Sequence, residues 1–138
     1  MAGSRRKGRI AALQILYEVD SSRHDWPTTV DRTLEESNLP EEAQRLAREL
    51  VEGVSSNLET LDASIQEHAP AWPVGQLSAV DRNILRIAIF EILLNNKTPP
   101  KAAINEAVEL AKIFGSENLH RFVNGVLGSV VAATAYKE

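Results

Sequence analysis

The sequence of 138 residues contains no cysteine, which excludes disulfide bonds and thiolate metal sites. Its apolar runs, such as residues 87–90, are far shorter than the ~20 residues of a membrane-spanning helix. The basic start of the chain continues into mixed sequence at residues 17–20, without the apolar segment of a secretory signal. We therefore expect a cytoplasmic protein with no membrane segment.

The sequence also lacks the patterns of an enzyme. His24, His68 and His120 are far apart, and none has the spacing of a metal-ligand pair. No phosphate-binding loop or nucleophile motif is present. Acidic pairs at residues 35–36 and 41–42 fall at polar helix starts, where negative charge is favoured by the helix dipole. We expect no enzymatic activity, no metal, no cofactor and no small-molecule substrate.

What the chain does contain is the composition of an ordinary globular protein, with 43% hydrophobic and 25% charged residues. Its length suits a single domain with a real hydrophobic core. No segment of useful length alternates as a strand would. The sequence therefore predicts an all-α, single-domain bundle of about six to seven helices. We expect a smaller N-terminal helical group over about 1–75, packed on a C-terminal bundle over about 76–138.

The spacing of apolar residues places the helices. It predicts helices from Ser4 as N-cap, around 29–37, from 40 with a possible break at 53–56, over 80–94, over about 101–113, and from Ser116 as N-cap to about 135. Ser78 and Asp81 resemble a capping box before residue 80. The helix over 80–94 is apolar almost all round, so we expect it to be the central helix of its bundle. Gly115 should stop the helix before it.

Charge is distributed unevenly along the chain. The net charge is −4, which alone argues against a nucleic-acid partner. However, Arg5, Arg6, Lys7 and Arg9 precede the first acid at Glu18, and the remainder holds 11 basic against 19 acidic residues, a net charge of −8. A basic end on an acidic body is typical of a charge-segregated binding surface, although a lone basic terminus is also compatible with a solvated tail.

The residues after this basic cluster favour binding. Ile10, Leu13 and Leu16 form one face of a helix, so the arginines project from an anchored element. Arginines bind phosphates, while Gln14 and Tyr17, further along, offer hydrogen bonds and a stacking surface. Four cations at a helix N-terminus also oppose its dipole, a cost that a bound anion would relieve.

Several residues near the C-terminus have two interpretations. Asn105 and Asn124 lie in otherwise apolar helices, and we expect internal hydrogen-bonding roles for both. Gly125 and Gly128 are costly in a helix, which favours close packing against another helix. Phe122 is compatible with either core packing or base stacking. The Trp-Pro pairs at residues 26–27 and 72–73 are expected to be helix-terminating anchors.

Several blocks, in the same order, resemble the NusB family of small helical RNA-binding transcription factors of bacteria. The blocks are the Arg-rich start and residues 12–17, 80–88, 104–112 and 122–127, which together span nearly the whole chain. The resemblance implies an all-helical protein that binds the boxA element of nascent, single-stranded RNA. It also implies pairing with the small-subunit ribosomal protein NusE, protein S ten, within the transcription elongation complex, in support of antitermination on ribosomal RNA operons.

The resemblance further implies which residues bind. The residues that match RNA-binding positions are Arg5, Arg6, Lys7, Arg9, Gln14, Lys112, Asn118 and Phe122. The residues that match positions where the family meets its ribosomal partner are Tyr17, Asp81 and Arg86. Two positions depart from the family pattern, because Gly128 and Asn118 stand where many relatives carry acids. An uncharged Asn118 repels phosphate less, so we expect stronger RNA binding than in acid-bearing relatives.

Three alternatives stay open or are disfavoured. The RNA-binding domain of RNA cytosine methyltransferases is related, but that enzyme needs a glycine-rich loop and a catalytic cysteine, which this chain lacks. A helix-turn-helix regulator needs a basic recognition helix, whereas the later helices carry scattered cations such as Arg121. A helical protein-interaction adaptor, with the basic end docking an acidic partner, stays possible. The sequence leaves open whether the chain is a monomer or a homodimer.

Overall fold

The computed structural model describes residues 3–95 and 97–135, and the regular elements of this part of the chain are all helical. Seven α-helices are present within these residues, together with one 3-10 turn and one π-helical turn. The all-α prediction is confirmed. The helices form two compact units, residues 1–57 and residues 58–138, each of which is described by itself.

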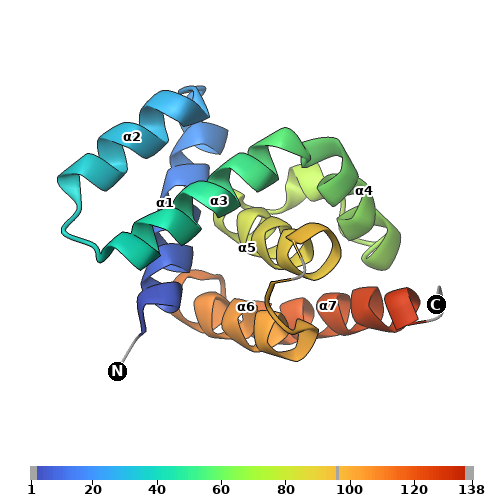
Figure 1. The fold of residues 1–138 in the computed structure, drawn as a ribbon. Coiled ribbons are helices and arrows are strands. Elements are labelled where there is room, and N and C mark those ends of the chain that lie inside the picture. Colours follow the sequence, from blue (N-terminus) through green and yellow to red (C-terminus); the bar gives the residue numbers. More distant parts are fainter. Residues whose placement is uncertain (1–2, 96, 136–138) are drawn as a thin grey trace. The chain divides into compact units, whose positions relative to one another are not determined.

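The first unit contains α1 (Ser4–Ser22), α2 (Trp26–Glu36) and α3 (Glu41–Ser56). In Figure 1, α1 passes behind α3, and the most extensive packing in the unit is between these two helices. Gly8 permits this approach, since a Cβ at that position would lie 2.8 Å from the carbonyl oxygen of Ala43 and 3.1 Å from the Cβ of Leu46. The unit's core is formed by buried apolar residues of all three helices, among them Leu13, Leu34 and Leu50.

The starts of α1 and α2 differ from the sequence-based expectation. Ser4 is the first residue of α1 rather than its cap, because Gly3 occupies the N-cap position without a side-chain hydrogen bond. Trp26 begins α2 instead of terminating a helix. The carboxylate of Asp25 caps α2, accepting a hydrogen bond of 2.8 Å from the backbone N–H of Thr28. Pro27 suits this first turn because its missing N–H has no intrahelical partner there.

The second unit contains α4 (Leu58–His68), the 3-10 turn η1 (Val74–Gln76), α5 (Ala79–Ile89), the π-helical turn η2 (Phe90–Asn95), α6 (Pro100–Phe114) and α7 (Leu119–Ala135). Helix α5 contacts α4, α6 and α7, so its prediction as the central helix of its bundle is confirmed. Figure 1 shows α6 and α7 lying side by side. Helix α4, which the sequence placed with the N-terminal group, packs on α5 and α7 and belongs to this unit.

Helix α5 begins as predicted and ends earlier. Ser78 is its N-cap, and its hydroxyl accepts a hydrogen bond of 3.1 Å from the backbone N–H of Asp81. The α-helical part stops at Ile89, and η2 continues the turn to Asn95 with a wider π-helical winding. The prediction of a single regular α-helix over 80–94 was therefore wrong for its last third, because the apolar pattern does not distinguish α from π windings.

The connection between α6 and α7 also differs from expectation. Gly115 ends α6 as predicted, and a Cβ there would overlap the side chain of Leu119. Ser116 does not cap α7, because the helix begins three residues later at Leu119. Asn118 has a left-handed backbone, with φ of 66°, that turns the chain into α7. Asparagine tolerates this conformation better than most residues.

Two expectations for α6 and α7 were wrong. Gly125 and Gly128 do not serve close helix packing, since a Cβ at either position would meet no atom within 4 Å. Asn105 and Asn124 are exposed rather than internal. The buried face of α7 is formed instead by Val123, Leu127 and their apolar neighbours.

Candidate nucleic-acid interface

The first turns of α1 carry the basic cluster that the sequence predicts as an RNA-binding block. Arg5 and Lys7 are exposed, and Arg6 is half-buried. Arg9 differs from them because it is only 4% exposed, so most of its side chain lies within the protein. The first turn of α1 contains no acid. The exposed cations therefore lie at the positive end of the helix dipole. Their own charges and the dipole both favour a bound anion there.

One exposed face of α1 continues this cluster toward the other end of the helix. Lys7, Gln14 and Tyr17 follow one another at intervals of seven and three residues, which keeps them on one side of the helix. Tyr17 is 48% exposed, so its ring is open to a partner. A pocket of about 190 Å³ lies along this face, between α1, the end of α2 and the segment that follows α2.

The far end of α1 is tied to α2 by ionic contacts. Glu18 accepts a hydrogen bond from Arg32 of α2, and its Oε2 lies 2.8 Å from Nδ1 of His24. The hydrogen bond from the Arg32 guanidinium, followed by that from His24, holds the pKa of Glu18 below its ordinary value. His24 is an exposed residue whose imidazole contacts Glu18.

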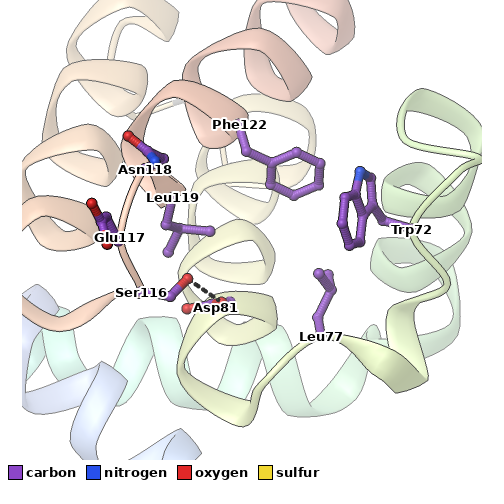
Figure 2. A pocket seen from close by; sticks show the side chains of 8 residues that line it. All are labelled: Trp72, Leu77, Asp81, Ser116, Glu117, Asn118, Leu119 and Phe122. Carbon is purple, nitrogen blue, oxygen red and sulfur yellow. Dashed lines mark hydrogen bonds between the residues drawn. The ribbon is translucent and has the colours of Figure 1, made fainter.

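The second unit has a pocket of about 250 Å³ that gathers three of the predicted residues (Figure 2). Its wall is aromatic, because Phe122 of α7 and Trp72 lie edge to face with ring centroids 6.1 Å apart and an interplanar angle of 72°. Trp72 follows the end of α4, as expected of a residue near a helix terminus, and it is 57% exposed. Leu77, which follows η1, and Leu119, the first residue of α7, both point into this pocket.

The floor of this pocket is polar. The hydroxyl of Ser116 donates a hydrogen bond of 3.1 Å to Oδ2 of Asp81. Asp81 is 8% exposed, and its Oδ1 is buried without a hydrogen-bond partner among the described residues. Only half of the predicted capping box is therefore made, since this carboxylate is directed to Ser116. The pocket brings Asp81, which the resemblance implies for protein binding, together with Asn118 and Phe122, which it implies for RNA binding.

Arg86 of α5 is engaged inside the second unit. Its Nε and Nη2 donate to Oδ1 and Oδ2 of Asp62, at 2.7 and 2.8 Å, and its Nη1 donates to Oδ1 of Asn83 at 3.2 Å. Arg86 is 8% exposed. This geometry gives Arg86 a structural role in joining α4 to α5, and its contact with a protein partner stays a prediction.

Lys112 occupies the last turn of α6, where a cation is favoured by the helix dipole. Its ammonium group lies 3.2 Å from a carboxylate oxygen of Glu109, and the lysine side chain is 52% exposed. An exposed ion pair of this kind is weak and is easily exchanged for a phosphate contact. Lys112 is thus accessible to a ligand, as the prediction requires.

The described residues contain no cluster of histidine and acidic side chains that could hold a metal ion, and none of their helices is long and apolar enough to cross a membrane. Residues 6–132 match the model of the NusB family. The chain belongs to the NusB family.

Relatives and solved structures within the NusB family are similar over nearly the whole chain. The transcription antitermination protein NusB of Roseiflexus sp. (strain RS-1) is 54% identical over 134 residues, which cover 96% of this chain and 94% of that protein. NusB of T. maritima has 34% identity and a TM-score of 0.85, covering 94% of this chain and 92% of that one. A crystal structure of antitermination factors NusB and NusE in complex with dsRNA has 28% identity and a TM-score of 0.86, covering 96% and 99%.

The sequence did not predict two residues that contact the candidate site residues of this NusB family member. Trp72 forms one wall of the pocket with Phe122, and the available signal was an aromatic residue in a segment broken by Pro70, Pro73 and Gly75. Asp62 holds Arg86, although the two are 24 residues apart. No local pattern marks such a pair, because it is created by the packing of α4 on α5.

Proposed function

We propose that this protein is a non-enzymatic, cytoplasmic transcription antitermination factor that binds boxA-type single-stranded RNA together with the ribosomal protein NusE. The observation that carries the proposal is the group of exposed cations at the start of α1, on a protein whose net charge is −4. RNA binding is dominated by phosphate contacts, which need such a segregated cationic surface. Membership of the NusB family supports the same function.

The proposed RNA contacts fall into two groups. On the first unit, they are made by Arg5, Arg6, Lys7, Arg9 and Gln14. On the second unit, they are made by Lys112, Asn118 and Phe122. We assign phosphate binding to the exposed arginines and lysines, because guanidinium and ammonium groups donate to phosphate oxygens. Arg9 contributes least to direct contact, because it is only 4% exposed.

The pocket at Phe122 suits a base better than a phosphate. Asp81 and Glu117 line it, and its lining includes no cation. A phosphate there would be repelled, whereas a base could lie against the ring of either Trp72 or Phe122. Asn118 at the rim adds no negative charge, which is consistent with this use of the pocket.

We propose that NusE contacts this protein through Tyr17, Asp81 and Arg86. We expect Tyr17 to contribute most to binding NusE, since a tyrosine that is 48% exposed offers a large apolar area and a hydroxyl group that can form a hydrogen bond. Asp81 and Arg86 are each only 8% exposed, so they would act mainly by shaping the surface around them.

The experiment that tests the function measures binding of a labelled single-stranded boxA-like RNA, with and without purified NusE. The wild type is compared with an Arg5→Ala/Arg6→Ala/Lys7→Ala variant. The control is Arg45→Ala/Arg48→Ala, which removes two exposed cations that are paired with Glu41 and Asp31 on the first unit. A double-stranded RNA of the same sequence is measured in parallel.

We expect tight binding of the single strand, enhanced by NusE, largely lost in the triple variant and kept in the control. The logarithm of the binding constant should fall with the logarithm of salt concentration by ~0.7 for each phosphate contact. No RNA binding by the folded wild-type protein, with or without NusE, would contradict the proposal and favour a protein-interaction adaptor. A preference for the duplex would contradict the assignment of single-stranded RNA.

A further inference from the structure

The pocket of about 190 Å³ on the first unit has a chemistry that the RNA-binding block alone does not account for. One side is formed by α1, where Lys7, Ile10, Ala11 and Gln14 follow the helical spacing of a single face. The other side is formed by the C-terminal end of α2 and the segment after it, through Thr33, Leu34, Ser37 and Leu39. The pocket therefore extends from the basic cluster to residues that no motif singled out.

The floor of the pocket is apolar and its rim is polar. Ile10, Ala11, Leu34 and Leu39 supply the apolar surface, and Lys7, Gln14, Thr33 and Ser37 the polar groups. The hydroxyl of Ser37 donates to the carbonyl of Leu34 at 2.8 Å, which leaves its oxygen able to accept a hydrogen bond. An apolar floor with a few convergent polar groups is the usual character of a ligand site.

Two polar groups at this rim have unused bonding capacity. Lys7 and Gln14 are both exposed, and within the part of the chain that the structure describes neither side chain has a hydrogen bond or ion pair. A carboxamide can donate and accept at once, and an ammonium group only donates. Lys7 is the charged residue among those that line the pocket, so its electrostatic preference is for an anion.

We propose that this pocket receives one nucleotide of the bound RNA. The base lies against the side chains of Ile10 and Leu39, its edge bonds to the carboxamide of Gln14, and its phosphate binds the ammonium group of Lys7. The inference rests on the proposed RNA-binding function and extends it to α2. A single nucleotide combines a planar apolar ring, hydrogen-bonding edges and a negative charge in one ligand.

The size of the pocket agrees with this occupant. At about 190 Å³, the pocket has room for one planar heterocyclic ring. The backbone near Leu39 is already positioned, because Nε2 of Gln44 donates to the carbonyl of Leu39 at 2.9 Å. The wall of the pocket therefore exists before a ligand arrives.

The first test uses charge-neutral variants of the full-length protein, Gln14→Ala and Leu39→Ala, measured against the boxA-like single-stranded RNA at several salt concentrations. We expect each variant to bind about five- to tenfold more weakly, the effect of one lost hydrogen bond or apolar contact. The dependence of affinity on salt should stay that of the wild type, because no phosphate contact is lost. Lys7→Ala should instead reduce the salt slope by ~0.7.

Matched controls are Gln66→Ala and Leu58→Ala, which remove an exposed glutamine and an exposed leucine of α4. Both should bind RNA as the wild type does. Circular dichroism establishes whether each variant is folded. If Leu39→Ala does not fold, Gln14→Ala still tests the pocket, because Gln14 is exposed and its loss should not disturb the fold.

The second test places 4-thiouridine at successive positions of the RNA and maps photo-crosslinks on the wild-type protein. The proposal predicts that one position crosslinks to residues 33–39. Wild-type affinity in Gln14→Ala and Leu39→Ala, with no crosslink in that segment, would overturn the pocket while leaving RNA binding through Arg5 and Arg6 intact. A loss of affinity seen only in the presence of NusE would overturn it too and assign the pocket to the protein partner. Absence of RNA binding by the wild type would refute both proposals.

Discussion

Arg86 and Asp62 form a bidentate ion pair that joins α5 to α4, with Nε–Oδ1 and Nη2–Oδ2 distances of 2.7 and 2.8 Å. The arginine side chain is 10% exposed and that of the aspartate 31%. A largely buried guanidinium group depends on the carboxylate that pairs with it, because an uncompensated buried charge is costly. The pair therefore links the orientation of α4 to the central helix of its unit.

Removing the carboxylate should destabilise the protein strongly. We expect Asp62→Ala to lower the free energy of unfolding by roughly 3 kcal/mol, because the largely buried charge of Arg86 loses its bidentate carboxylate. Chemical denaturation monitored by circular dichroism measures this change. The control is Glu41→Ala, which breaks the exposed pair with Arg45 and should leave stability nearly unchanged. Equal effects of the two substitutions would show that the Arg86 pair has no special role.

Adding one methyl group should have opposite effects at two glycines. We expect Gly8→Ala to destabilise the protein by ~1–3 kcal/mol, because its Cβ would lie 2.8 Å from the carbonyl oxygen of Ala43. Gly128→Ala should stabilise it by up to ~1 kcal/mol, since nothing lies within 4 Å and alanine is the better helix former. Thermal melting distinguishes the two. Destabilisation by Gly128→Ala would indicate a packing role for that glycine.

A negative charge at residue 118 should weaken RNA binding. Asp81 and Glu117 already line the pocket beside Asn118, so Asn118→Asp would add a third acid next to the RNA. We expect about a five- to tenfold loss of affinity at low salt that diminishes as salt is raised. Aspartate tolerates the left-handed backbone at this position, and Asn118→Gly controls for the loss of the amide. Unchanged affinity in Asn118→Asp would remove residue 118 from the RNA surface.

The aromatic side chains of the pocket at Phe122 should contribute to RNA affinity through apolar contact area rather than through charge. Phe122→Ala and Trp72→Ala are each expected to weaken RNA binding by ~1–3 kcal/mol if a base stacks on the ring. The salt dependence should be that of the wild type. Trp26→Ala, at the start of α2 in the first unit, is a control for loss of a tryptophan. A salt slope that changes along with affinity would argue against stacking and for a rearranged surface.

Stability should decline in mild acid through two carboxylates. The guanidinium of Arg32, with His24, lowers the pKa of Glu18 below 4.5, and the N–H of Thr28 lowers the pKa of Asp25 below 3.8. A carboxylate with a lowered pKa in the folded state stabilises fully above its ordinary pKa, and this contribution is lost as pH falls through the folded value.

Melting temperature measured from pH 7 to pH 3 should therefore fall below about pH 4.5. The decline should be shallower in Glu18→Gln, in which the contact to Arg32 no longer titrates. Glu52→Gln controls for the loss of one exposed negative charge on α3. An acid transition of the same steepness in Glu18→Gln and the wild type would show that this contact does not contribute.

Much of the helical architecture could be predicted because its causes are local. The apolar run from Ile84 onward requires a buried central helix whatever surrounds it, and Ser78 caps that helix through a backbone N–H three residues away. Gly115 ends α6 for a similarly local reason. The predictions that failed were also local in form: Ser4 and Ser116 are good caps in general, but the chain enters α1 at Gly3 and α7 through the left-handed Asn118.

The candidate site was predictable in kind and less so in detail. The basic cluster at the start of α1 was visible from charge alone, yet the sequence could not distinguish exposed Arg5 from buried Arg9, since both are arginines on one helix. Trp72 and Phe122 are 50 residues apart, and their contact exists only because the segment that follows α4 lies against α7 at one pocket.

The sequence by itself determined that this protein is helical, that its cations gather at one end, and which apolar stripes must be buried. These properties depend on residue type and on spacing along a helix of fixed period. The tertiary structure alone decided which polar groups meet: Asp62 with Arg86, Ser116 with Asp81, and Gln14 of α1 with Ser37 beyond α2 around one pocket. Such meetings depend on how helices pack against one another, and packing is set by the shape of whole surfaces rather than by any single stretch of chain.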